Sequence, residues 1–195
     1  MTMMDFPFFG NALWVDFLNT EPALPDGSQG DLIATPDAFD RWARAAGLAS
    51  AEGLFVPDQA EMEEVLLFRT LLREGAKSLT ASQPPPVATI AAVNQKLAHS
   101  PLISTLVESG VGWDLISRPK ASPVAGLLGK VAADFAGTLV SKRSDKLRRC
   151  GHQGCAMLFI DTSKNGKRRW CSMETCGNRE KAAGHRARMR RSATK

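Results

Sequence analysis

The segments CGHQGC, residues 150–155, and CSMETCGNR, residues 171–179, contain all four cysteines of this 195-residue chain. Each pair of cysteines is separated by four residues, and fifteen residues lie between the two pairs. In a reducing compartment, thiols spaced in this way are typical ligands of Zn²⁺, which binds four of them in a tetrahedron. The pattern therefore predicts one structural zinc ion, held by Cys150, Cys155, Cys171 and Cys176.

Other roles for the thiols stay open at this point. They could be buried thiols without a metal, or they could have a redox or disulfide role, and His152 could replace one of them as a ligand. A catalytic zinc needs an open coordination position and a nearby general base, whereas four thiolates close the site. The sequence therefore favours a metal that stabilises structure over one that performs chemistry.

The residues between the cysteine pairs must bring the second pair back to the first. AMLFI, residues 156–160, is typical of a strand, and KRRWC, residues 167–171, is expected to be the return strand of a β-hairpin with a tight turn at Asn165 and Gly166. A helix is expected to begin near Cys176, where the helix dipole stabilises a thiolate. The predicted order of knuckle, β-hairpin and helix is that of a treble-clef-like zinc finger.

Charge divides the chain into residues 1–140 and residues 141–195. The first part has nine Lys and Arg against sixteen Asp and Glu, a net charge of −7, and the second has sixteen against four, a net charge of +12. So much like charge in a short segment repels itself, and it favours a polyanionic partner. A solvated basic tail is the alternative, but the paired cysteines and apolar runs favour a folded basic domain behind an acidic one.

The N-terminal domain is expected to be mostly α-helical with one small β-hairpin, an α+β fold. TPDAFDRWARAAGL, residues 35–48, begins with a capping Thr and a Pro and ends with Gly, which are the usual limits of a helix. Residues 102–117 contain two apolar runs around ESG, as in a hairpin, and residues 12–18 are too few to assign to helix or strand. Further helices are expected at about 58–79, 87–98 and 122–140.

The expected C-terminal helix is strongly basic. Ala182 and Met189 form a narrow apolar stripe, and basic residues line both of its flanks. Arginine has a planar fork of donors that matches phosphates and guanine edges. Gly184 lowers helix propensity by about 1 kcal/mol, so the end of the helix is expected to order on DNA. The expected nucleic-acid contacts are Arg179, Lys181, Arg186, Arg188, Arg190 and Arg191 of this helix, with Lys167, Arg168 and Arg169 before it.

Residues 170–179, with LFIDTSKNGKRRW before them and KAAGHRAR after them, resemble the CGNR zinc-finger family. The signature consists of Cys176, Gly177, Asn178 and Arg179, and Glu180 follows it where the family more often has a small residue. LWVDFLNT, residues 13–20, is similar to the opening of the ABATE domain that precedes this finger in the family.

The resemblance implies a treble-clef finger ligated by the four cysteines, in a bacterial transcription regulator linked to stress response. It also implies a sensory or ligand-responsive N-terminal domain, and hence an unknown small-molecule effector. Within the signature, Gly177 would allow tight backbone packing, Asn178 could cap the helix, and Arg179 would reach a phosphate or a base. Alternatively, Asn178 and Arg179 only brace the knuckle.

These observations predict a cytoplasmic, DNA-binding transcription regulator that associates with the nucleoid when bound and is not an enzyme. Duplex DNA is the expected partner, and a homodimer would suit paired half-sites. No phosphate-binding glycine loop or nucleophile motif occurs. No membrane partner is expected, because no segment reaches the roughly 20 uninterrupted apolar residues that span a bilayer.

Two alternatives to DNA binding stay open. The first is an RNA-binding or protein-interaction adaptor with a structural zinc, although the only aromatic residues of the basic part, Phe159 and Trp170, are expected to be structural. The second is a nuclease, which needs a His base and a second metal site. His152 and His185 are present, but the basic part contains only four acidic residues, so the nuclease is the less favoured of the two.

Overall fold

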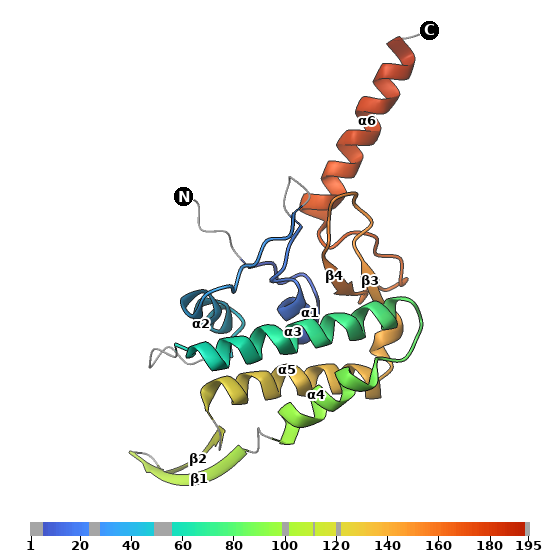
Figure 1. The fold of residues 1–195 in the computed structure, drawn as a ribbon. Coiled ribbons are helices and arrows are strands. Elements are labelled where there is room, and N and C mark those ends of the chain that lie inside the picture. Colours follow the sequence, from blue (N-terminus) through green and yellow to red (C-terminus); the bar gives the residue numbers. More distant parts are fainter. Residues whose placement is uncertain are drawn as a thin grey trace.

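The computed structural model describes residues 6–23, 28–48, 56–98, 102–110, 112–119 and 122–193. Figure 1 shows a layer of helices, a hairpin at one end of it, and a long helix that projects from the other side. The helices of the layer are α1 (Leu13–Leu18), α2 (Pro36–Ala45), α3 (Gln59–Thr80), α4 (Val87–Ala98) and α5 (Pro123–Val140).

The helices begin where the sequence provides capping side chains. Thr35 accepts a hydrogen bond from the Ala38 N–H, with Pro36 at the first position of α2. Asp58 and Glu61 form a reciprocal capping box at the start of α3. Such caps satisfy the N–H groups that a helix leaves unpaired at its first turn. The four helices expected in the N-terminal domain are confirmed as α2, α3, α4 and α5. The short segment that the sequence left undecided is the helix α1.

The core lies where α5 contacts α1, α3 and α4. Trp14 and Phe135 meet edge to face at 5.1 Å between ring centroids, and Phe17 packs against Trp42 of α2 at 5.3 Å. All four rings are buried, and burial of such a side chain stabilises the fold by about 1.5–3 kcal/mol. Among the described helices, α5 alone is long and apolar enough to cross a membrane by composition, but half of it is buried in this core.

The predicted hairpin of the N-terminal domain is present. It consists of β1 (Leu102–Ser109) and β2 (Gly112–Pro119), which pair in antiparallel register. In Figure 1 the hairpin projects from the helical layer on the side away from the C-terminal helix.

The finger begins with a 3₁₀ turn, η1 (Arg143–Lys146). The strands β3 (Leu147–Arg149) and β4 (Leu158–Ile160) follow and form an antiparallel pair, with the first cysteine pair in the connection between them. A π-helical turn, η2 (Met173–Gly177), continues into α6 (Asn178–Ala193). The helix near Cys176 is therefore confirmed.

The strand pairing predicted for the finger is wrong in one respect. The partner of β4 is β3, not residues 167–171, which are not a strand. Leu147 and Ile160 are paired and bury their side chains in the core, whereas Lys167 and Arg169 are exposed. A strand on the core side needs apolar side chains, which KRR does not supply. The predicted turn is present, since the Gly166 N–H donates to the Ser163 carbonyl at 3.1 Å.

The finger strands share their core with the helical part. Leu147, Leu158 and Ile160 belong to the same cluster of buried residues as the helix side chains. The amide of Asn19 donates to the Leu158 carbonyl at 3.0 Å and accepts from the Leu158 N–H at 2.9 Å, and the Ile160 N–H donates to the Gly10 carbonyl at 2.8 Å. The net charge changes sign near residue 140 of the sequence. The side chains before and after this residue nevertheless pack together.

Candidate metal centre and basic surface

The four cysteine sulfurs lie within 4.8 Å of one another. Cys155 Sγ is 3.8 Å from Cys171 Sγ, which is 3.6 Å from Cys176 Sγ. A tetrahedral zinc with Zn–S bonds of about 2.3 Å separates its sulfurs by about 3.8 Å. All four thiols are free, and their separations are far longer than the roughly 2 Å of a disulfide bond. The geometry therefore fits one zinc ion bound by four thiolates.

The pKa values of the cysteine thiols also fit a site for a cation. The hydrogen bond with Cys171 lowers the pKa of the Cys155 thiol to about 5. The same hydrogen bond, then burial and the charge of Cys155, raise the pKa of Cys171 above its usual range. Burial, more than any other cause, raises the pKa of Cys176 to about 11. Thiolates this close repel one another, and a divalent cation between them allows all four to be deprotonated.

The backbone folds so that each pair of cysteines faces the other. In the knuckle, the Cys150 N–H donates to the Met157 carbonyl at 2.9 Å, and the Cys155 N–H donates to the His152 carbonyl at 3.1 Å. Gly154 has φ = +82°, a conformation that glycine adopts without strain. The Cys171 N–H donates to Cys150 Sγ at 3.4 Å, which joins the two halves of the site and stabilises the thiolate.

Trp170 lies close to two glycines of the finger. A Cβ at Gly151 would lie 3.2 Å from the Trp170 ring, and a Cβ at Gly177 would lie 3.0 Å from the same ring and 2.5 Å from Met173 Sδ. A side chain at either position would therefore require its neighbours to move. Gly177 is tightly packed, as expected. The atoms closest to it are side-chain atoms of Met173 and Trp170.

His152 is not a ligand in this geometry. Its Nδ1 lies 2.6 Å from Glu180 Oε1, so the ring faces α6 and the metal cluster consists of cysteines alone. The pair connects the knuckle to the first turn of α6. Sequence reasoning missed this contact. The only signal for it was an acidic residue in a very basic helix, without any indication of its partner.

The prediction that Asn178 caps the helix is wrong. The capping residue is Ser172, whose side chain accepts a hydrogen bond from the Thr175 N–H at 3.2 Å. The helix begins one turn earlier than expected, through η2, so Asn178 already has helical backbone angles, and its amide donates to the Glu174 carbonyl at 3.1 Å. This contact fits the alternative in which Asn178 braces the turn.

Arg168, one of the candidate nucleic-acid contacts, lies against its own chain. Its Nε donates to the Trp170 carbonyl at 2.9 Å, and its Nη2 donates to the carbonyls of Phe9 and Cys171. Its guanidinium also lies over the ring of Phe159, 4.3 Å from the centroid. The Nε and Nη2 donors of Arg168 are used by backbone carbonyls, so this edge of its guanidinium fixes the cysteine loop to the body and is not available to a phosphate.

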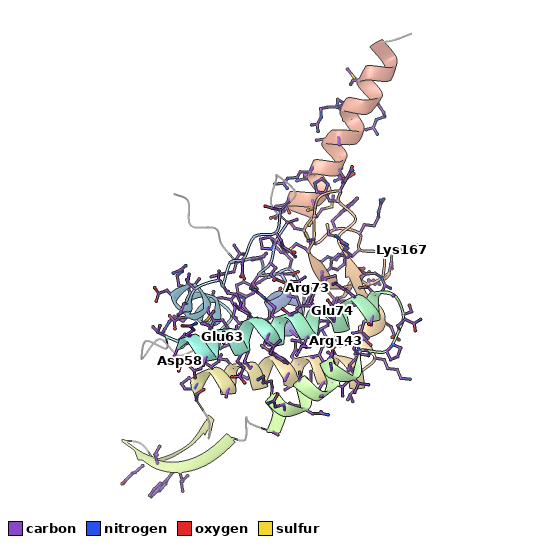
Figure 2. All side chains as sticks on the ribbon, in the orientation of Figure 1. Asp58, Glu63, Arg73, Glu74, Arg143 and Lys167 are labelled. Carbon is purple, nitrogen blue, oxygen red and sulfur yellow. The ribbon has the colours of Figure 1, made fainter. Side chains whose placement is uncertain are left out.

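The other candidate nucleic-acid contacts whose side chains the structure describes lie on the surface. Lys167 and Arg169 are exposed on the loop before η2, where Figure 2 labels Lys167, and the Arg169 guanidinium covers the Trp170 ring at 4.6 Å. α6 projects from the rest of the molecule (Figure 1), and the side chains of Arg190 and Arg191 lie outside the described residues. The exposed basic residues of α6 are Arg179, Lys181, Arg186 and Arg188.

Comparison with protein families gives two matches that together span most of the chain. The CGNR zinc finger matches residues 146–189. The ABATE family, described as "Putative stress-induced transcription regulator", matches residues 11–142. Both likenesses expected from the sequence are therefore confirmed, in the expected order. No curated protein matches the chain.

Proposed function

The chain belongs to the ABATE family and carries a CGNR zinc finger, and from this premise we propose that it is a transcription regulator that binds duplex DNA through α6. The observation that carries the proposal is a basic helix without a buried face, held at one end by a metal centre. Between Lys181 and Met189, every residue with a described side chain is exposed, except the half-buried Gly184.

Such a helix gains little stability from its own chain. Most helices in proteins are stabilised by burying an apolar face, and α6 has only Ala182 and Met189 for one, with Met189 61% exposed. A 16-residue helix is about 24 Å long, and the major groove of DNA is wide enough to admit it. Its arginines and Lys181 would then meet phosphates and base edges.

RNA binding is less well supported than DNA binding. Single-stranded RNA is usually held by stacking bases on exposed aromatic side chains. In the described part of the finger, Phe159 is buried, and Trp170 is half-buried with Arg169 over its ring, so neither ring is fully exposed for stacking. Competition between duplex DNA and RNA of the same sequence separates the two partners.

We also infer that the protein works by binding and not by catalysis. Four thiolates fill the tetrahedral positions of a zinc ion, and His152 is engaged with Glu180. Incubation with single- and double-stranded nucleic acid and Mg²⁺ or Mn²⁺ tests this inference, and metal-dependent cleavage would contradict it. A cytoplasmic location, association with the nucleoid and a homodimer that reads paired half-sites belong to the same proposal.

The salt dependence of DNA binding tests the proposed interface. Each phosphate neutralised contributes about −0.9 to the slope of log affinity against log salt. We expect the double substitution Lys181→Gln with Arg186→Gln to make this slope shallower by about 1.8. Arg41→Gln is the matched control, since Arg41 is exposed on α2. An unchanged slope in the double variant, or an equal change in Arg41→Gln, would contradict the interface.

Selection of bound duplexes from a random pool tests whether the protein reads sequence. We expect the selected duplexes to converge on a motif, because arginine forks in the major groove distinguish guanine from other bases. Enrichment without a motif would leave only charge attraction and would contradict a role in recognising particular sites.

A further inference from the structure

A cavity of about 700 Å³ lies beside the metal centre. Its walls come from the knuckle, from Arg149 at the end of β3, from Arg179 in the first turn of α6, and from Ala23 of the ABATE domain. This volume is within the range of small-molecule sites. The cavity therefore joins the two family regions at the base of the helix proposed to bind DNA.

The described lining of the cavity contains two arginines and no carboxylate, and it also includes Cys150 and Cys155, whose thiolate charge a bound zinc ion balances only in part. Arg149 and Arg179 enter it from different elements, and His152 and Gln153 add polar groups. Both arginines are exposed, and neither guanidinium has a hydrogen-bond or ion-pair partner among the described residues. An anion in this cavity would therefore find two guanidiniums whose donors have no partner among the described residues.

A smaller cavity continues the positive surface toward α3. Its volume is about 230 Å³, and it shares Arg149 and Ala156 with the first. Its lining includes Arg73 and Lys77 of α3, and Figure 2 labels Arg73 on the side of α3 that faces the finger. Arg73 is already paired with Glu21 and Lys77 with Glu74, so Arg149 is the cation of this second cavity that stays available to a ligand.

We propose that the larger cavity binds a small molecule carrying a phosphate group, and that this ligand weakens DNA binding. Guanidinium forks bind phosphate oxygens through paired, charge-assisted hydrogen bonds. Part of the proposal rests on the proposed function, because Arg179 belongs both to the cavity and to the DNA-binding helix. A phosphate held by Arg179 takes away one contact with DNA and adds negative charge beside it.

The ligand and DNA can be bound together, because Lys181 and Arg186 lie outside the cavity lining. Saturation with ligand then lowers DNA affinity to a limit and does not abolish binding. Coupling between two sites in one protein typically changes affinity by about 5- to 150-fold. A DNA backbone phosphate seated in the cavity would instead compete with the ligand without limit.

The first experiment is calorimetric titration of the zinc-loaded full chain with inorganic pyrophosphate in the absence of DNA. We expect one site per chain. Arg149→Gln should weaken binding by about 10- to 100-fold, since it removes charge-assisted hydrogen bonds, while Arg41→Gln should bind like the unaltered protein. Absence of saturable binding, or equal binding by Arg149→Gln, would overturn the proposal, as would heat that accompanies release of zinc from the protein.

The second experiment measures the dissociation constant for duplex DNA at increasing pyrophosphate and constant ionic strength. A rise that reaches a plateau supports the small-molecule site. A rise that continues in proportion to pyrophosphate identifies the cavity as a subsite for the DNA backbone and overturns it, and no rise overturns the coupling. If the chain bound no DNA, the proposed function would fail, while the calorimetric result would still decide whether the cavity binds phosphate.

Discussion

At the scale of single residues, two glycines give Trp170 its place in the finger. Gly151 and Gly177 both lie close to the ring, and each is next to a cysteine ligand. Trp170 thus contacts both the knuckle and η2, the two segments that a bound metal would also join. Burial of this ring and metal binding are expected to stabilise the finger together.

Gly177→Ala is expected to destabilise the finger. The new Cβ would lie 2.5 Å from Met173 Sδ, which is near the end of a flexible, exposed side chain, and 3.0 Å from Trp170, so the expected cost is at the low end of about 1–3 kcal/mol. Zinc affinity, measured by competition with a chelator, should fall accordingly. Gly137→Ala in α5 is the matched control, because a Cβ there meets no atom within 4 Å and Ala favours a helix by about 1 kcal/mol. Equal zinc affinity in both variants would contradict this packing role.

Asp16 predicts a pH dependence of stability. Burial raises its pKa from 3.8 to about 6, the Gly10 N–H partly opposes this, and Asp134 adds to it. The folded chain therefore holds this proton more tightly than the unfolded chain, and the contribution of Asp16 to stability falls as pH rises from about 4 to 6.

Asp16→Asn should remove this dependence, since the amide oxygen can still accept from the Gly10 N–H, which is 2.7 Å from the carboxylate. The free energy of unfolding of Asp16→Asn, relative to that of the unaltered protein, should rise by about 1–2 kcal/mol between pH 5 and pH 8. Urea unfolding of both proteins at the two pH values measures it. A gain that does not change with pH would contradict the raised pKa.

Residue identity allowed the metal ligands to be predicted but not the fate of each arginine. The chain contains only four cysteines, and their spacing is that of zinc ligands. The four ligands could therefore be predicted from the sequence. Arg168 was assigned with its neighbours, although alternate residues of an extended segment point in opposite directions. That alternation was the available signal that one arginine of KRR turns inward, but its carbonyl partners, including Phe9, are too distant in sequence to be foreseen.

At the scale of elements, Asn19 connects α1 to the finger sheet. Its amide makes two hydrogen bonds with the backbone of Leu158, as a neighbouring strand would. The side chain is 2% exposed, so water cannot replace these bonds. One buried residue at the end of a short helix thus completes the edge of β4.

Asn19→Ala is expected to destabilise the whole fold. It leaves the N–H and carbonyl of Leu158 without these partners, at a cost of about 1–3 kcal/mol for each group. Chemical denaturation measures the loss. The control is Asn94→Ala on the exposed face of α4, which should change stability by no more than about 0.5 kcal/mol. A loss in Asn19→Ala as small as in the control would contradict the contact.

α6 is expected to matter for binding and not for stability. Deleting residues 185–195 removes five Lys and Arg but no residue of the core. The thermal midpoint should stay the same, while the salt-dependence slope of DNA binding should become shallower by up to about 4.5. A large fall in the midpoint would show that the helix packs on the body, and an unchanged slope would remove this part of α6 from the interface.

The helices were easier to predict than the pairing of strands. Thr35 and Asp58 act on residues three positions away, so a short window of sequence contains the whole interaction. Whether β3 or residues 167–171 pair with β4 depends on which of these two segments can bury its side chains in the core. That core includes α1, whose Asn19 is bonded to Leu158 from 139 residues earlier in the chain, and no local pattern contains this information.

At the scale of the whole molecule, the acidic and basic parts differ in charge, and β3 and β4 of the basic part pack into the core of the acidic part, while the cysteines and Phe159 form a second cluster. Leu147 and Ile160 lie in the cluster built by the ABATE helices, and the cavity of about 700 Å³ is shared by both parts. α6 therefore extends from a finger that is joined to the ABATE core by β3 and β4. In our proposal, a change in the ABATE domain reaches the DNA-binding helix through this connection.

The central claim is that zinc holds α6 in the position from which it reads DNA. It is tested most directly by the ratio of affinities for the selected duplex and a scrambled duplex, measured by fluorescence anisotropy with and without zinc. We predict that the zinc-loaded chain prefers the selected duplex and that removal of zinc brings the ratio to about one, because only charge attraction remains. The same preference after zinc removal, or no duplex binding by the zinc-loaded chain at low salt, would contradict the claim.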